Sequence, residues 1–187
     1  MLLVIGNKNY SSWSLRPWLA MKVLGLAFDE KRIALYDPGA KAEILRHSPS
    51  GKVPCLVEGS LAIWDSLAIL EYLAERHPQL WPADAAERAR ARSIAAEMHA
   101  GFAHLRNHMG MNVRKRYPGR GRTPEVLEEV KRIDAIGHAC IQLPEDHGII
   151  FPGGYYLIRG EAKLFDHDPV DMELQRAVRS PNGEDVL

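Results

Sequence analysis

The first part of the chain alternates between short β-like runs and one amphipathic helix, and this order limits the folds open to it. Residues 2–5 are apolar and β-leaning, and residues 30–35 form a second short run of the same kind. Between them, apolar residues recur at helical spacing over residues 15–26, with Pro17 expected in the first turn and Gly25 at the end. This order predicts a βαβ unit with two parallel strands.

The next segment carries the signals of a β-hairpin and of further helices. Residues 40–46 predict a weak helix. Two β-like runs, 53–58 and 61–64, are joined around a Gly-Ser pair that is typical of a hairpin. A helix capped at residue 65 or 66 should end before Pro78. We therefore expect an α/β domain over residues 1–78, with helices on the faces of a small mixed sheet.

After residue 84 the pattern becomes helical. One apolar stripe predicts a single long helix, and its members are Ala91, Ile94, Ala95, Met98, Phe102 and Leu105. Thr123 and Pro124 form an N-cap and first-turn pair for a second long helix. The sequence therefore predicts a partial helical domain over residues 85–140, followed by an irregular tail rich in glycine and proline over residues 141–187.

The charge balance and the lack of long apolar runs narrow the possible partners. The chain has 24 basic and 24 acidic residues, which favours neither nucleic acid nor an anionic membrane as partner. The apolar N-terminal run is too short for a signal peptide, and no stretch approaches a membrane span. Cys55 and Cys140 form no CxxC pair and no metal-ligand pattern. We expect a cytoplasmic protein without a bound metal.

Serines mark the first candidate site, between the first strand and the first helix. A helix that starts here exposes unpaired N–H groups and the positive end of its dipole, which would stabilise an anion such as a thiolate. A hydroxyl of Ser11 or Ser12 pointing at the sulfur would lower the pKa of the thiol. Arg16 adds positive charge one turn later. The alternative is that the serines only cap the helix.

A proline inside a β-like run marks the second candidate site. A cis Val53–Pro54 bond would turn the Val53 backbone outward, where it could pair with an extended peptide. A trans proline at the first residue of a strand is the alternative.

The third candidate site is the Asp65-Ser66 pair at a helix start. A carboxylate beside a hydroxyl and free N–H groups suits the two charged ends of an amino acid, with Asp65 facing the ammonium group and Ser66 the carboxylate. Helix capping alone is again the alternative.

The order and spacing of these three sites resemble the N-terminal, thioredoxin-like domain of glutathione S-transferases. The motif at residues 11–16, Ser-Ser-Trp-Ser-Leu-Arg, has the form found in the zeta-like bacterial group, although zeta enzymes usually have cysteine where Trp13 stands. The resemblance spans residues 2–140 and includes Met-Asn-Val-Arg at residues 111–114 and the basic loop at residues 117–122.

The resemblance implies a role for each matching residue. Ser11 would hydrogen-bond the glutathione sulfur and favour the thiolate, with Ser12 as second candidate and Tyr10 as a rival from other classes of the family. Cys55 is expected to be a small buried residue. The residues expected to bind glutathione are Arg16, Lys52, Val53, Pro54, Asp65 and Ser66. His99, His104 and His108 lie on one predicted helix, but without an HExxH motif they favour no zinc site.

The sequence thus predicts an α/β thioredoxin-like domain followed by an incomplete all-α domain, since no Ser/Thr-x-x-Asp capping box follows Thr123. The resemblance implies a homodimeric enzyme that transfers the glutathione thiolate to a small electrophile or uses glutathione as cofactor for a zeta-like isomerisation. One alternative is a non-catalytic glutathione-binding or protein-interaction module with a degenerate second domain. Another is a product that folds poorly.

Overall fold

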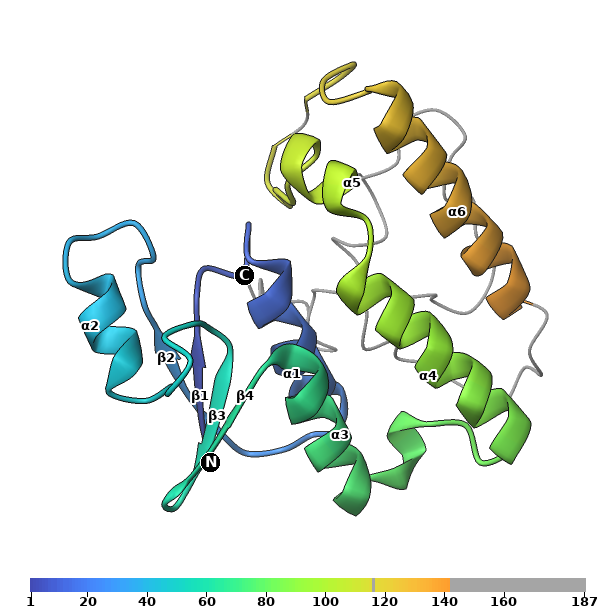
Figure 1. The fold of residues 1–187 in the computed structure, drawn as a ribbon. Coiled ribbons are helices and arrows are strands. Elements are labelled where there is room, and N and C mark those ends of the chain that lie inside the picture. Colours follow the sequence, from blue (N-terminus) through green and yellow to red (C-terminus); the bar gives the residue numbers. More distant parts are fainter. Residues whose placement is uncertain (116, 142–187) are drawn as a thin grey trace.

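The computed structural model describes residues 1–115 and 117–141 (Figure 1). The predicted tail over residues 141–187 therefore lies almost wholly outside the described residues. The elements are β1 (Leu2–Ile5), α1 (Ser12–Val23), β2 (Asp29–Arg32), α2 (Ala40–Leu45), β3 (Cys55–Glu58), β4 (Leu61–Trp64), α3 (Ser66–Arg76), the 3₁₀ turn η1 (Pro78–Leu80), α4 (Ala85–Ala100), α5 (Ala103–His108) and α6 (Pro124–Ile141).

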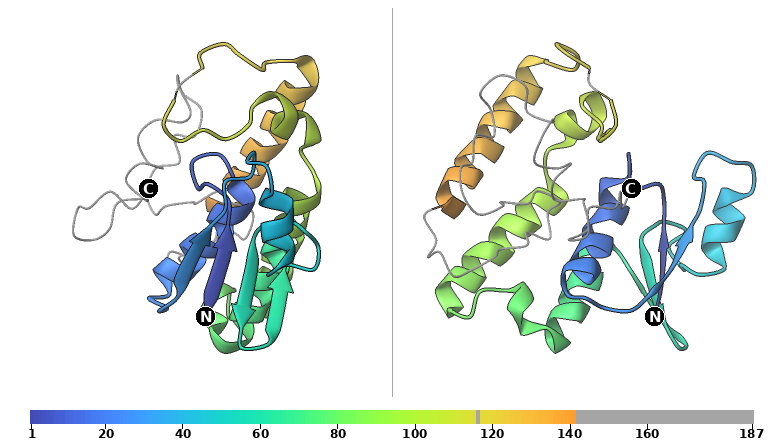
Figure 2. Two further views of the ribbon diagram at one scale, coloured as in Figure 1. Left: turned by 90° about the vertical axis from the view of Figure 1, so that its left-hand side faces the viewer. Right: turned by 180° about the vertical axis from the view of Figure 1, so that it is seen from behind.

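The four strands form one mixed sheet in the order β2-β1-β3-β4. β1 pairs with β2 in parallel and with β3 antiparallel, while β3 and β4 form the antiparallel hairpin. The βαβ unit and the hairpin predicted from the sequence are thus confirmed. Figure 2 shows α2 on one face of the sheet and α1 and α3 on the other.

Residues of β1 alternate between the two faces, as a strand buried on both sides requires. Leu3 and Ile5 belong to the large core under α1 and α3. Val4 points to the opposite face and packs with residues of α2, including Ile44. The first strand is therefore the centre of the fold, and its carboxyl end leads directly into the first candidate site.

Three local expectations about the first half need correction. The first strand of the hairpin covers residues 55–58 instead of 53–58. Helix α1 begins at Ser12, so Pro17 lies in the second turn and not in the first. The second strand covers residues 29–32 instead of 30–35, and all four of its residues are charged. Pairing with β1 in the register Leu2 to Asp29 overrides the local apolar signal of residues 33–35.

The long apolar stripe after residue 84 is divided between two helices, so the prediction of one helix was wrong. Helix α4 ends at Ala100, and Phe102 adopts a positive φ of 64°. A Cβ added to Gly101 would lie 2.9 Å from the Glu97 carbonyl oxygen, which explains why glycine stands at this close approach. The apolar periodicity continues through the break because Met98 of α4, Phe102 between the helices and the partly buried Leu105 of α5 contribute to the same cluster.

Helix α4 contributes to two cores. Ala91 and Ala95 belong to the core of the α/β part, whereas Met98 packs with Phe102 and Ile133 in a separate cluster beside α6. The predicted cap of α6 is confirmed, because Thr123 Oγ1 accepts a hydrogen bond from the Val126 N–H at 3.3 Å. Within the described ranges, none of the helices is both long and apolar enough to cross a bilayer.

Candidate functional site

The first serine of the motif lies at the start of α1. Ser11 is the N-cap residue, is 8% exposed, and its Oγ accepts a long hydrogen bond of 3.4 Å from the Ser14 N–H. The capping role considered from the sequence is therefore real. It does not compete with a role toward an anion, because the free N–H groups and positive dipole end of α1 remain at the same place.

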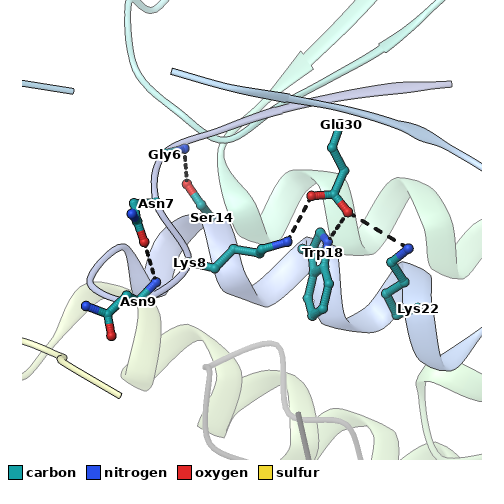
Figure 3. A network of polar contacts seen from close by, with 8 residues as sticks. All are labelled: Gly6, Asn7, Lys8, Asn9, Ser14, Trp18, Lys22 and Glu30. Atoms are coloured by element: carbon teal, nitrogen blue, oxygen red, sulfur yellow. Dashed lines mark hydrogen bonds and ion pairs between the residues drawn. The ribbon is translucent and has the colours of Figure 1, made fainter. Parts of the chain in front are cut away.

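A buried hydrogen-bond chain connects this cap to the end of β1. The Gly6 N–H donates to Ser14 Oγ at 2.9 Å (Figure 3). The Ser11 hydroxyl donates to the same oxygen at 3.0 Å. Ser14 was not singled out from the sequence. Its position three residues after an N-cap serine was the signal that could have identified it.

A second polar network holds the loop that carries Ser11 against β2. The Glu30 carboxylate accepts hydrogen bonds from Lys8 at 2.9 Å and from the Trp18 indole, and Lys22 lies 3.9 Å away (Figure 3). Partial burial raises the pKa of Glu30, but the hydrogen bonds from Trp18 and Lys8 and the charges of Lys8 and Lys22 outweigh it and hold that pKa below its ordinary value. Glu30 thus connects both the loop, through Lys8, and α1, through Trp18 and Lys22, to β2.

The peptide bond between Val53 and Pro54 is cis, so the alternative of a trans proline was wrong. Val53 is half-buried two residues before β3 begins, and Lys52 beside it is exposed. Cys55 follows as a fully buried residue whose thiol donates to the His47 carbonyl at 3.4 Å, and burial raises the pKa of this thiol. This confirms the interpretation of Cys55 as a small buried residue.

The Asp65-Ser66 pair begins α3, which packs against α1. Asp65 has a positive φ of 78°, and its Oδ1 accepts hydrogen bonds from the N–H groups of Leu67 at 2.9 Å and Ala68 at 3.3 Å. Ser66 is 1% exposed, and within the described part of the chain its buried Oγ has no hydrogen-bond partner. A strained backbone next to an unsatisfied buried hydroxyl is a feature of ligand sites.

A cluster of side chains around Trp13 joins the α/β part to the helical part, which the sequence did not predict. The Trp13 ring lies between the guanidinium groups of Arg16, 4.3 Å from its centroid, and Arg106, at 4.7 Å. His99 contacts the same ring edge-on at 5.1 Å, and its Nε2 lies 3.2 Å from Asp65 Oδ2. Arg16 is 3% exposed, so its predicted contact with a ligand remains a prediction.

The other two histidines singled out from the sequence lie on α5. The His104 and His108 rings stack 6.3 Å apart, and His108 Nδ1 is 2.9 Å from the His104 carbonyl oxygen. Across residues 1–115 and 117–141, no three histidine, cysteine or acidic residues are grouped so that they could hold a metal ion.

Two family models match the chain. Residues 10–76 match the model described as glutathione S-transferase, N-terminal domain. Residues 124–187 match DUF3686, described as an ATPase involved in DNA repair, and the structure describes only α6 of that range.

The curated relatives, like the match to the N-terminal domain model, belong to glutathione S-transferases and maleylacetoacetate isomerases. The chain is 35% identical over 124 residues to maleylacetoacetate isomerase from Pseudomonas aeruginosa, covering 63% of this chain and 57% of that protein. It is 38% identical over 82 residues to a glutathione S-transferase of the zeta class from Euphorbia esula, covering 42% and 36%. The chain spans about half the length of the curated relatives it matches, for instance 47% and 52% of two of them.

Solved structures show the same fold. A rice glutathione S-transferase in complex with glutathione superimposes with a TM-score of 0.51 at 24% identity, covering 74% of this chain and 61% of that one. The fold expected from the sequence, a thioredoxin-like α/β domain followed by helices, is thereby confirmed.

Proposed function

We propose, from the premise that residues 10–76 are an N-terminal domain of the glutathione S-transferase family with zeta-like relatives, that this chain binds glutathione and activates its thiol. One observation carries the proposal: the Ser11 hydroxyl caps α1, at the positive end of a helix whose N–H groups face the same point. A sulfur at that point gains a hydrogen bond and a favourable field only when it is ionised, so its pKa falls.

The remaining residues support a bound glutathione that lies across the N-termini of α1 and α3. The Asp65 carboxylate is the proposed partner of the γ-glutamyl ammonium group. The Ser66 hydroxyl, which has no hydrogen-bond partner among the described residues, fits the adjoining carboxylate as a hydrogen-bond donor. The Val53 backbone, placed by the cis Pro54, is the proposed partner of the cysteinyl unit, and the exposed Lys52 that of the glycyl carboxylate.

The reaction we propose is attack of the bound thiolate on a small electrophile, or a zeta-like isomerisation with glutathione as cofactor. The isomerase name of the Pseudomonas aeruginosa relative supports the second form. In both, the residues of this chain hold the tripeptide and keep the sulfur ionised, and Ser12 is the second candidate for the hydroxyl that does so.

A homodimer in the cytoplasm is part of the same proposal. Leu61 and Trp64 are exposed on β4, the edge strand of the sheet, and such apolar side chains favour association with a second copy. Sedimentation of the purified chain tests this point.

Calorimetry with glutathione, followed by a conjugation assay with a panel of electrophiles, tests the proposed function. We expect Ser11→Ala to retain glutathione binding and to lose activity by about tenfold or more, because one hydrogen bond to the developing anion is removed. Unchanged rates in this variant would remove Ser11 from the mechanism. Binding without turnover on any electrophile would support the non-catalytic alternative.

A further inference from the structure

We infer that Ser14 is a positioning residue that aims the Ser11 hydroxyl at the glutathione sulfur. The inference rests on the proposed function, because it concerns how Ser11 stabilises the thiolate. It adds a second, fully buried hydroxyl to the site.

The position of Ser14 is fixed by the backbone of the sheet. Its side chain is 0% exposed, and its Oγ accepts a 2.9 Å hydrogen bond from the Gly6 N–H (Figure 3). Gly6 directly follows β1, the central strand, and a Cβ added to it would lie 2.8 Å from Leu35 Cδ1. The donor that holds Ser14 is therefore part of a tightly packed strand end.

Ser14 also holds the hydroxyl that the proposed mechanism needs. Without a ligand, the Ser11 hydroxyl donates its proton to Ser14 Oγ at 3.0 Å. A hydroxyl has one proton to donate, so in this arrangement the Ser11 proton is directed away from any sulfur. Activation of a thiol by Ser11 therefore requires this hydrogen bond to change direction.

The geometry allows that change without any movement of the oxygen atoms. When a thiolate arrives, the Ser11 O–H turns toward the sulfur, which can only accept. The Ser14 O–H then turns toward Ser11 Oγ over the same 3.0 Å, and the Gly6 N–H continues to donate to Ser14. Only hydroxyl rotations occur, no proton changes its atom, and no covalent bond forms or breaks.

The reversed chain runs in one direction, from the Gly6 N–H through Ser14 and Ser11 to the sulfur. Hydrogen bonds aligned in this way polarise one another, so each strengthens the next. Ser14 should thus make Ser11 a better donor and lower the pKa of the bound thiol. A Ser14 that only ties β1 to α1 would contribute to stability and leave thiol ionisation unaltered.

A double-mutant cycle separates these two roles. The thiolate fraction of glutathione bound to the full chain is followed by its ultraviolet absorbance across pH, for wild type, Ser11→Ala, Ser14→Ala and the double variant. Ser14→Cys, which keeps a side chain of similar size, is the second variant in case Ser14→Ala does not fold. Ser48→Ala is the matched control, since Ser48 is another serine with 0% exposure and bonds Ser50.

We expect Ser14→Ala or Ser14→Cys to lower the thiolate fraction at neutral pH about three- to tenfold, which is the size of one weakened hydrogen bond to a charged acceptor. The double variant should lose no more than Ser11→Ala alone, because Ser14 acts through Ser11, and Ser48→Ala should lose nothing. If the folded Ser14 variants ionise the thiol as wild type does, or if the two losses simply add, the inference is wrong while the proposed function stands. If Ser11→Ala itself leaves ionisation unchanged, the proposed function fails.

Discussion

His99 Nε2 lies 3.2 Å from Asp65 Oδ2, and this contact joins α4 to the start of α3. The other carboxylate oxygen of Asp65 caps α3 through the N–H groups of Leu67 and Ala68. Each oxygen of one side chain therefore has a separate role, one in the helix start and one at the junction with the helical part. A substitution of Asp65 that keeps the helix cap but removes the charge can therefore separate its effect on protein stability from its effect on glutathione binding.

Asp65→Asn is expected to weaken glutathione binding about tenfold, because an amide cannot replace a charge-assisted bond to an ammonium group. The free energy of unfolding should change by less than about 0.5 kcal/mol, since asparagine caps helices as well as aspartate and tolerates positive φ. Calorimetry and thermal melting measure the two quantities.

Asp84→Asn is the matched control, because Asp84 caps α4 through the Ala86 and Glu87 N–H groups, both at 2.9 Å. It should bind glutathione as wild type does. Equal binding by Asp65→Asn and wild type would contradict the assignment of Asp65 to the ammonium group.

Trp13→Leu should destabilise the protein by about 1–3 kcal/mol, because the smaller leucine side chain has no aromatic face for the two guanidinium groups and the imidazole that contact the indole. Denaturant unfolding measures the loss. Tyr117→Leu is the control, since Tyr117 is exposed. Among the described residues, Arg120 lies over its ring at 5.9 Å and Asn112 donates a long hydrogen bond of 3.4 Å to its hydroxyl. A Trp13 variant as stable as this control would show that the stacked cluster contributes nothing to joining the two parts.

Glu58→Gln should lower the melting temperature at neutral pH and have progressively less effect in acid. The hydrogen bonds from Arg76 and Tyr72 lower the pKa of Glu58 from 4.5 to about 2. A carboxylate whose pKa is lower in the folded than in the unfolded state stabilises the protein when the pH is above its unfolded-state pKa. This contribution is lost as the pH falls through its folded-state pKa. The difference in melting temperature between variant and wild type should therefore become smaller as the pH falls from 4.5 to about 2.

Arg76→Gln should also have a lower melting temperature than wild type at neutral pH, with a difference that becomes smaller in acid. This substitution removes the main cause of the depressed pKa of Glu58. Thermal melts at steps of pH follow both variants. A gap of constant size from neutral to acid pH would contradict the ion pair as its source.

Gly121→Ala should cost more stability than Gly119→Ala, although both glycines have nearly the same positive φ of 74° and 72°. A Cβ at Gly121 would overlap the His108 carbonyl oxygen, whereas no atom of the described residues lies within 4 Å of a Cβ at Gly119. We expect Gly119→Ala to lower the free energy of unfolding by about 1 kcal/mol from backbone strain alone, and Gly121→Ala to lower it by about 3 kcal/mol or more. Equal losses in chemical denaturation would show that the close approach to α5 is relieved at little cost.

Local signals were sufficient to predict the α/β part of the fold. The βαβ order, the hairpin and the helix starts at residues 65–66 and 123–124 each depend on neighbours in sequence, such as caps and turn residues. The break after Ala100 was missed because the apolar stripe continues on both sides of Gly101. That break depends on a close backbone contact, which no periodicity records.

The candidate site was predictable only where a residue acts through its own helix or strand. Ser11, Pro54 and Asp65 belong to this group, since each has a local role in a cap or a turn. The roles of Ser14, Trp13 and His99 were not predicted, because each has a partner in another part of the fold, namely Gly6, Arg106 and Asp65 respectively. Only tertiary packing brings α4 and the end of β1 to the first turns of α1 and α3.

The double membership of α4 has a mechanical consequence. Ala91 and Ala95 in its middle pack into the core under α1 and α3, and Met98 in its last turn packs with α6. A force applied between the sheet and α6 would therefore pass through α4, which is one continuous helix over Ala85–Ala100. Two dyes, one on the α/β part and one on α6, should accordingly report a single separation that does not depend on solvent viscosity as long as α4 stays helical.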